Sequence, residues 1–123
     1  MNPPVIRRGQ IWLVDWSPRR GSEQLSKRPA LVIKTNAANS NPRYPNTIVV
    51  TLSTKGLPVA THIPIEPDAS NGLREKSWVK CEQVLTISKQ HLDQQWGHLS
   101  AASMSKVESA VRAALGMQSS GNR

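Results

Sequence analysis

Polar side chains at the ends of predicted strands are the residues of this sequence that could do chemistry. Arg28 stands just before an apolar run that begins at Ala30, so a rigid strand would hold its guanidinium in one direction. Arginine binds phosphate through two parallel hydrogen bonds and stays charged at any working pH. The alternative is an ion pair with a carboxylate such as Glu23, and the spacing does not choose between the two.

A second group is the hydroxyl pair Ser53 and Thr54, which follows the β-branched run 47–52. At the end of a buried strand these hydroxyls could bind a phosphate or a ribose. Ser and Thr also bond to local backbone in ordinary turns. For this pair alone, the turn is the commoner explanation.

A third group lies within residues 79–83. Strand alternation puts Lys80 and Glu82 on one face and Cys81 on the other. Glu is a possible general base, and Lys could stabilise a developing negative charge. The alternative is a solvated charge pair between neighbouring strands.

Other chemistries find little support in the sequence. His62, His91 and His98 are not spaced as metal ligands and Cys81 stands alone, so we expect no metal site. There is no glycine-rich phosphate loop and no nucleophile elbow. A ribonuclease that uses His62 with His91 or His98 stays open as an alternative.

The chain is strongly basic. Its 123 residues carry 16 Lys and Arg against 8 Asp and Glu, a formal charge of +8. Such a field attracts polyanions, and nucleic acid is the obvious partner. The single cysteine excludes an internal disulfide and, with no signal peptide or membrane span in the sequence, indicates the cytoplasm.

The elements that must position these groups are mainly strands. Alternation and β-branched residues predict strands over 10–16, 30–34, 47–52 and 61–65, with one or two more within 77–87. Pro64 places 61–65 at an edge. Apolar residues on both faces of 10–16 suggest that one face meets the core and the other a loop or a partner subunit.

Only the end of the chain has a helical pattern. Met104, Val107, Val111 and Leu115 form one stripe, and Gly116 follows as a stop. Two starts are open: Ser100 is a plausible N-cap, and Ser105 with Glu108 offers a second start as a capping box. We therefore expect a mostly β fold, a small antiparallel barrel with a C-terminal helix. It would occupy 1–117 as one domain, followed by a disordered tail, 118–123.

In this order the segments resemble the MazF/PemK family of toxin–antitoxin endoribonucleases. The stretches that carry the resemblance are Arg8-Gly9-Gln10-Ile11-Trp12, Gly21-Ser22-Glu23-Gln24 with Arg28-Pro29, Ile48–Thr54, and Val79–Gln83 with Thr86-Ile87. The resemblance spans roughly Arg7–Leu115. It implies an SH3-like barrel of the CcdB/PemK type that forms a homodimer. It also implies metal-independent, cofactor-free cleavage of single-stranded RNA at a short sequence, leaving a 2′,3′-cyclic phosphate and a 5′-hydroxyl.

The resemblance also implies roles for single residues. Arg28 matches the family's catalytic Arg, which implies that it stabilises transition-state charge and could also donate a proton. Ser53 and Thr54 fall where relatives carry Thr and Ser, in swapped order, so both are expected to be catalytic, and which of them contacts the scissile phosphate stays open. Glu82 and Lys80 occupy the late-strand positions of the PemK branch's Asp and Arg. That branch's first-loop His is Ser22 here, so a mechanism through that His is not expected. The residues expected to contact RNA are Ser22, Glu23, Gln24, Lys27, Lys80 and Gln83.

The same resemblance implies a partner, an acidic antitoxin of the MazE/PemI kind whose disordered tail folds on binding. Opposite charges would speed that encounter. Two alternatives remain. One is a gyrase-binding toxin like CcdB, although the C-terminal helix lacks the Trp that family uses. The other is an RNA-binding barrel without catalysis.

Overall fold

The computed structural model describes residues 5–16 and 27–117. The predictions for Ser22, Glu23 and Gln24, and for the disordered tail 118–123, lie outside the described residues.

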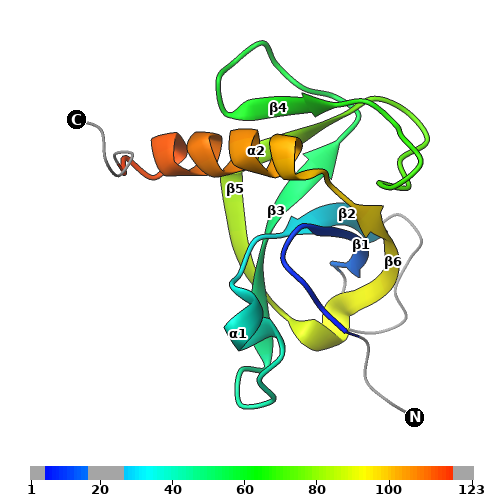
Figure 1. The fold of residues 1–123 in the computed structure, drawn as a ribbon, viewed down its shortest axis with the longest axis vertical. Coiled ribbons are helices and arrows are strands. Elements are labelled where there is room, and N and C mark those ends of the chain that lie inside the picture. Colours follow the sequence, from blue (N-terminus) through cyan, green and yellow to red (C-terminus); the bar gives the residue numbers. More distant parts are fainter. Residues whose placement is uncertain (1–4, 17–26, 118–123) are drawn as a thin grey trace.

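Within this part of the chain the fold is a six-stranded antiparallel sheet followed by a helix (Figure 1). The strands run in the order β4-β5-β3-β2-β1-β6. The mostly β prediction with a C-terminal helix is thus confirmed. The strands are β1 (Gln10–Asp15), β2 (Lys27–Val32), β3 (Asn46–Ser53), β4 (His62–Ile65), β5 (Ser77–Ser88) and β6 (Leu92–His98). The helix is α2 (Ala101–Ala114), and two short segments, α1 (Asn36–Asn39) and η2 (Lys89–His91), lie in connections.

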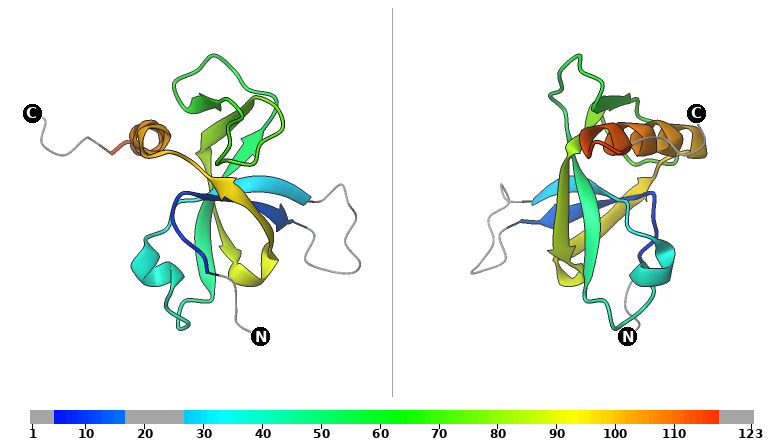
Figure 2. Two further views of the ribbon diagram at one scale, coloured as in Figure 1. Left: turned by 45° about the vertical axis from the view of Figure 1, so that its right-hand side comes forward. Right: turned by 90° about the vertical axis from the view of Figure 1, so that its left-hand side faces the viewer.

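The sheet curls strongly, but its two edge strands do not pair in the described chain (Figure 2). The segment after β4 bridges the gap: the backbone N–H of His98 donates to the carbonyl of Ser70 at 2.9 Å. Gly97 lies so close to this segment that a Cβ there would stand 2.2 Å from the Ser70 oxygen. The sheet is therefore not closed into a barrel by strand pairing, and a loop contacts β6 across the gap.

Both faces of β1 are buried, each in its own apolar cluster. Ile11 packs in a cluster with Leu31, Val50 and Val107. Trp12 and Val14 pack in a second cluster on the other face of the sheet. The sequence led us to expect a loop or partner subunit on one of these faces, and the structure places part of the protein's own core there.

Helix α2 begins and ends as its sequence predicts. The Ser100 hydroxyl accepts a hydrogen bond from the Ser103 N–H at 3.1 Å. Gly116 adopts a φ of +72°, and the Met117 N–H donates to the Arg112 carbonyl at 2.8 Å. The expected stripe is correct except at Leu115, which is 56% exposed because the helix has already ended. The buried residues of α2 are Met104, Val107 and Ala110.

Two elements were not expected from the sequence. The sequence of β6 is polar because β6 is an edge strand. Its pairing with β1 contains two register shifts. Helix α1 lies in a segment that reads as a loop. It is stabilised from elsewhere: the Lys89 ammonium donates to the carbonyls of Ala38, Asn39 and Asn41 at 3.3, 2.9 and 3.3 Å.

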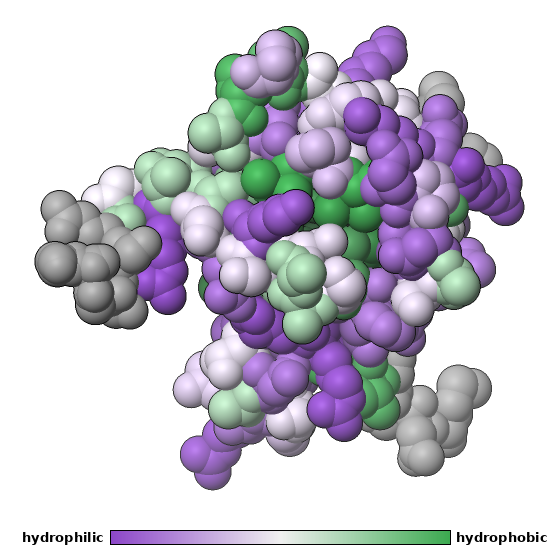
Figure 3. Space-filling view, turned by 45° about the horizontal axis from the view of Figure 1, so that its top comes forward, coloured by the Kyte–Doolittle hydropathy of each residue, from purple (hydrophilic) through white to green (hydrophobic). Residues whose placement is uncertain are grey.

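Hydrophilic side chains cover most of the face shown in Figure 3, around an apolar area near the centre of the view. None of the described helices has the length and apolar character needed to cross a bilayer.

Candidate functional site

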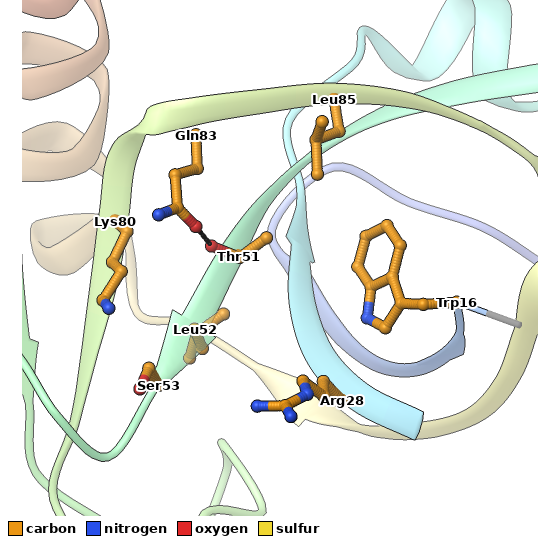
Figure 4. Close-up of a pocket in the computed structure, with 8 residues that line it drawn as sticks. All are labelled: Trp16, Arg28, Thr51, Leu52, Ser53, Lys80, Gln83 and Leu85. Carbon is orange, nitrogen blue, oxygen red and sulfur yellow. Dashed lines mark hydrogen bonds between the residues drawn. The ribbon is translucent and has the colours of Figure 1, made fainter. Parts of the chain in front are cut away.

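A cavity of about 410 Å³ opens on the outer side of strands β2, β3 and β5 (Figure 4). It collects four residues that the sequence analysis singled out: Arg28, Ser53, Lys80 and Gln83. The described residues that line it are Trp16, Arg28, Thr51, Leu52, Ser53, Lys80, Gln83 and Leu85.

Strand register explains why these side chains meet. Ala30 of β2 pairs with Thr51 of β3, so Arg28, two residues earlier, falls level with Ser53. Thr51 in turn pairs with Lys80 of β5. Residues directly opposite each other, or two apart on one strand, share a face of the sheet. Three strands therefore deliver a guanidinium, a hydroxyl and an ammonium to one surface.

A bulge in β5 adds the fourth residue. Val50 pairs with Val84 and Thr51 with Lys80, which leaves residues 81–83 without partners on β3. Glu82 and Gln83 both turn outward while Cys81 stays buried. The Thr51 hydroxyl donates a hydrogen bond to the Gln83 side-chain oxygen, which fixes the amide at the cavity wall (Figure 4).

A second cavity of about 270 Å³ adjoins the first. The two share Arg28, Leu52 and Ser53, so the guanidinium and the hydroxyl stand on their common boundary. Thr54 lines only the second cavity. The other residues of that lining are Pro29, Leu73, Arg74, Glu75, Ser77 and Trp96.

The Ser53 hydroxyl also takes part in a local turn. Its oxygen accepts a hydrogen bond from the Lys55 N–H at 3.1 Å. Ser53 therefore bonds to local backbone, as expected for an ordinary turn. Because the backbone N–H uses a lone pair, the hydroxyl proton stays available for a ligand in either cavity.

The described residues that line the first cavity include two cations, Arg28 and Lys80, and no carboxylate. Within the described residues, no carboxylate lies at ion-pair distance from Arg28 or Lys80. Lys27 differs, because its ammonium lies 3.6 Å from Asp93. Arg28 and Lys80 are thus the cations that an incoming anion meets.

Glu82 does not line either cavity. Its carboxylate lies 2.8 Å from Nε2 of His62 on β4. Partial burial alone would raise the pKa of the Glu82 carboxyl. Hydrogen bonds from His62, from its own backbone and from the Thr61 hydroxyl outweigh that effect and hold the pKa below its ordinary value. The carboxylate that does share a cavity with Arg28 and Ser53 is Glu75, which the sequence analysis did not select.

The histidines do not form the pair that the sequence left open. Both ring nitrogens of His62 are engaged, Nε2 with Glu82 and Nδ1 with the backbone N–H of Leu57 at 3.0 Å. His62 therefore presents no free nitrogen to His91 or His98.

The donors at the first cavity suit an oxyanion: guanidinium, ammonium, hydroxyl and amide groups. In the stretches 5–16 and 27–117, no three His, Cys, Asp or Glu side chains gather as metal ligands would.

Several residues that line the two cavities were not predicted from the sequence. Thr51 could have been found, because it alternates with Ser53 on a strand that the sequence predicts. Trp16, Arg74 and Trp96 come from three separate segments. No local sequence pattern predicts that they line these cavities.

The profile of the PemK-like, MazF-like toxins of type II toxin–antitoxin systems matches residues 7–115. An endoribonuclease MazF from Staphylococcus epidermidis is 34% identical over 116 residues, which cover 92% of this chain and 93% of the relative. The toxin MazF-mt6 of Mycobacterium tuberculosis superposes with a TM-score of 0.72 at 25% identity, over 89% of this chain and 99% of that one. A mycobacterial endoribonuclease, solved in complex with its cognate antitoxin, gives a TM-score of 0.75 at 24% identity, over 93% and 98% of the two chains.

Proposed function

Because the chain belongs to the PemK-like, MazF-like toxin family of type II toxin–antitoxin systems, we propose that it is an endoribonuclease that cuts single-stranded RNA. The substrate's own 2′-hydroxyl attacks the adjacent phosphate. One observation gives the proposed RNA cleavage its main support. Arg28 and Ser53 stand where two cavities meet, so a phosphate bound there has room for a nucleotide on either side.

In this reaction Arg28, Ser53 and Lys80 stabilise charge. The phosphate gains negative charge as the 2′-oxygen bonds to phosphorus. The Arg28 guanidinium and the Ser53 hydroxyl donate hydrogen bonds to its non-bridging oxygens, and the Lys80 ammonium lies across the same cavity. Donors placed before the reaction contribute most in the transition state, where the charge is largest.

Proton transfer completes the chemistry. Glu82 stands outside the first cavity, next to its lining residue Gln83, and accepts the proton of the 2′-hydroxyl when the ribose extends past the cavity wall. Its lowered pKa keeps it ionised at neutral pH. Lys80 gives a proton to the departing 5′-oxygen as its bond to phosphorus breaks. The products are a 2′,3′-cyclic phosphate and a 5′-hydroxyl, and no metal ion takes part.

Two carboxylates compete for the role of base, and their amide variants distinguish them. We expect Glu82→Gln to lower kcat by about 10²-fold, the usual contribution of a general base. We expect Glu75→Gln to have the smaller effect. If Glu75→Gln has the larger effect, the base is the carboxylate that lines the second cavity.

The indole rings favour a single-stranded substrate. Trp16 lines the first cavity and Trp96 the second, on either side of the proposed phosphate position. Unpaired bases stack on aromatic side chains, whereas bases in a duplex are not free to do so. Gln83, Thr54 and Lys27, and the residues Ser22, Glu23 and Gln24, complete the proposed RNA contacts.

We also propose a cytoplasmic homodimer that an acidic antitoxin inhibits. The mycobacterial relative was solved with its cognate antitoxin, and the charge of +8 favours an acidic partner here. A peptide across the first cavity would pair with Arg28 and Lys80 and exclude RNA.

The test is digestion of a long defined RNA by the purified protein, followed by sequencing of the new 5′ ends and chemical analysis of both ends. We expect cuts at one short sequence, cyclic phosphate ends, and unchanged activity in excess chelator. Tight binding that leaves the RNA intact would instead indicate a binding module. Loss of cutting in chelator would overturn the metal-free mechanism.

A further inference from the structure

His62 is one of the buried titratable side chains, among the described residues, that the proposed chemistry leaves without a role. It is the first residue of β4, and its side chain is 6% exposed. Both of its ring nitrogens are hydrogen bonded, to the Leu57 N–H and to the Glu82 carboxylate.

These two bonds give the ring nitrogens different roles. A backbone N–H can only donate, so Nδ1, which accepts from Leu57, carries no proton. The ring proton is therefore on Nε2, where it is donated to the Glu82 carboxylate at 2.8 Å. His62 thus accepts a hydrogen bond at one end of its ring and donates one at the other.

The two bonds tie together two irregular segments beside the cavities. Leu57 belongs to the connection 54–61, which begins directly after Ser53 and includes Thr54 of the second cavity. Glu82 belongs to the bulge of β5, and its neighbour Gln83 contacts Thr51 in the first cavity.

His62 is also level with the site in the sheet. It pairs with Lys80 across β4 and β5, and Lys80 pairs with Thr51 across β5 and β3. The three residues form one row through three strands. Two of the three, Lys80 and Thr51, line the first cavity.

We propose that His62 is a positioning residue for the RNA-cutting site, which rests on the function proposed above. Its Nδ1 holds the connection 54–61 through Leu57, and its Nε2 holds Glu82 and the bulge. The first bond places the hydroxyl of Thr54 for substrate binding. The second aims the Glu82 carboxylate for proton transfer.

Two conservative variants separate the two bonds. The side-chain oxygen of Asn lies near the position of Nδ1, so His62→Asn keeps an acceptor for Leu57 and loses the donor to Glu82. The side-chain nitrogen of Gln lies near the position of Nε2, so His62→Gln keeps the donor and loses the acceptor. His62→Ala loses both, and His98→Asn makes the same change at an exposed histidine of β6.

We expect opposite kinetic effects on a defined RNA oligomer. In His62→Asn, kcat falls about 10-fold while KM stays within about twofold, because only the proton acceptor is misplaced. In His62→Gln, KM rises about fivefold with kcat nearly unchanged. His62→Ala shows both losses and His98→Asn neither. Equal losses in the Asn and Gln variants, in proportion to their folded fractions, would show a purely structural role and overturn the proposal.

Hydrogen exchange of the Leu57 amide gives a readout that does not depend on cleavage. We expect protection in the wild type and in His62→Asn, and faster exchange in His62→Gln and His62→Ala. Unchanged exchange in all variants would show that His62 does not hold the connection. If the wild type cuts no RNA, the proposed function fails, and exchange still reports whether His62 holds Leu57 through their hydrogen bond.

Discussion

At the scale of single residues, the geometry of the guanidinium is what makes Arg28 suited to a phosphate. It lies on the boundary of two cavities, with no carboxylate partner among the described residues. A planar fork of N–H groups binds two phosphate oxygens at once, which an ammonium cannot do.

We therefore predict that Arg28→Ala lowers kcat/KM for RNA cleavage by about 10²-fold or more, and that Arg28→Lys recovers only part of that loss. Arg43→Ala removes an exposed arginine after α1 and serves as the matched control. Initial rates on a fluorescent oligomer measure the effect. Full activity in Arg28→Ala would move the catalytic site elsewhere.

Cys81 shows the opposite case, a reactive group kept inert. Burial, and to a lesser extent the charge of Glu82, raises the pKa of its thiol from 9.0 to about 11. Between these values the unfolded chain releases the thiol proton and the folded chain keeps it. The contribution to stability is therefore complete below pH 9 and is lost as the pH rises through about 11.

We predict that the free energy of unfolding falls less steeply between about pH 9 and pH 11 in Cys81→Ala than in the wild type. Urea titrations at several pH values measure the difference. Thiol reagents should modify the native protein slowly at about pH 8 and quickly in urea. Rapid modification of the native protein would show that Cys81 is accessible.

At the scale of elements, α2 is held by the face it buries rather than by its ends. Val107 is 1% exposed and packs in the same cluster as Ile11 and Val50, whereas Leu115 is 56% exposed beyond the helix. The sequence pattern places both residues on one apolar stripe, but only Val107 is buried in the structure.

We predict that Val107→Ala lowers the free energy of unfolding by about 2 kcal/mol, because two buried methyl groups and their packing are lost. Leu115→Ala should change it by less than about 0.5 kcal/mol. Chemical denaturation followed by tryptophan fluorescence compares the two. Similar losses in both variants would show that the last turn is buried in solution.

At the scale of the whole molecule, charge governs the encounter with RNA. The excess of eight positive charges attracts any polyanion, while Arg28, Lys80 and Arg74 at the two cavities form the local contacts. A phosphate that binds these cations releases counterions into solution.

We predict that log Kd for an uncleavable oligomer, with a 2′-deoxy sugar at the cut site, rises linearly with log salt concentration. A slope of about 2 corresponds to three phosphate contacts on a single strand. Arg28→Ala should reduce the slope by about 0.7. Titrations by fluorescence anisotropy measure it. An unchanged slope would place the phosphates away from Arg28.

Much of the fold was predictable because its signals are local. β-branched runs predicted the core strands, Ser100 and Gly116 predicted the ends of α2, and Pro64 predicted an edge strand, which β4 is. The residue types of the site were visible for the same reason. A strand end exposes the polar group that flanks the apolar run, so Arg28, which precedes one run, and Ser53, which follows another, could be selected without coordinates.

Only the tertiary structure decided what these residues do together. Arg28 meets Ser53 and Lys80 because β2, β3 and β5 pair in one register, and register depends on contacts far apart in the chain. The bulge at 81–83 joins Glu82 to His62, and the Lys89 ammonium stabilises α1 from fifty residues away. Local sequence carries strand and helix propensity, but a hydrogen bond between distant segments exists only after the sheet has formed.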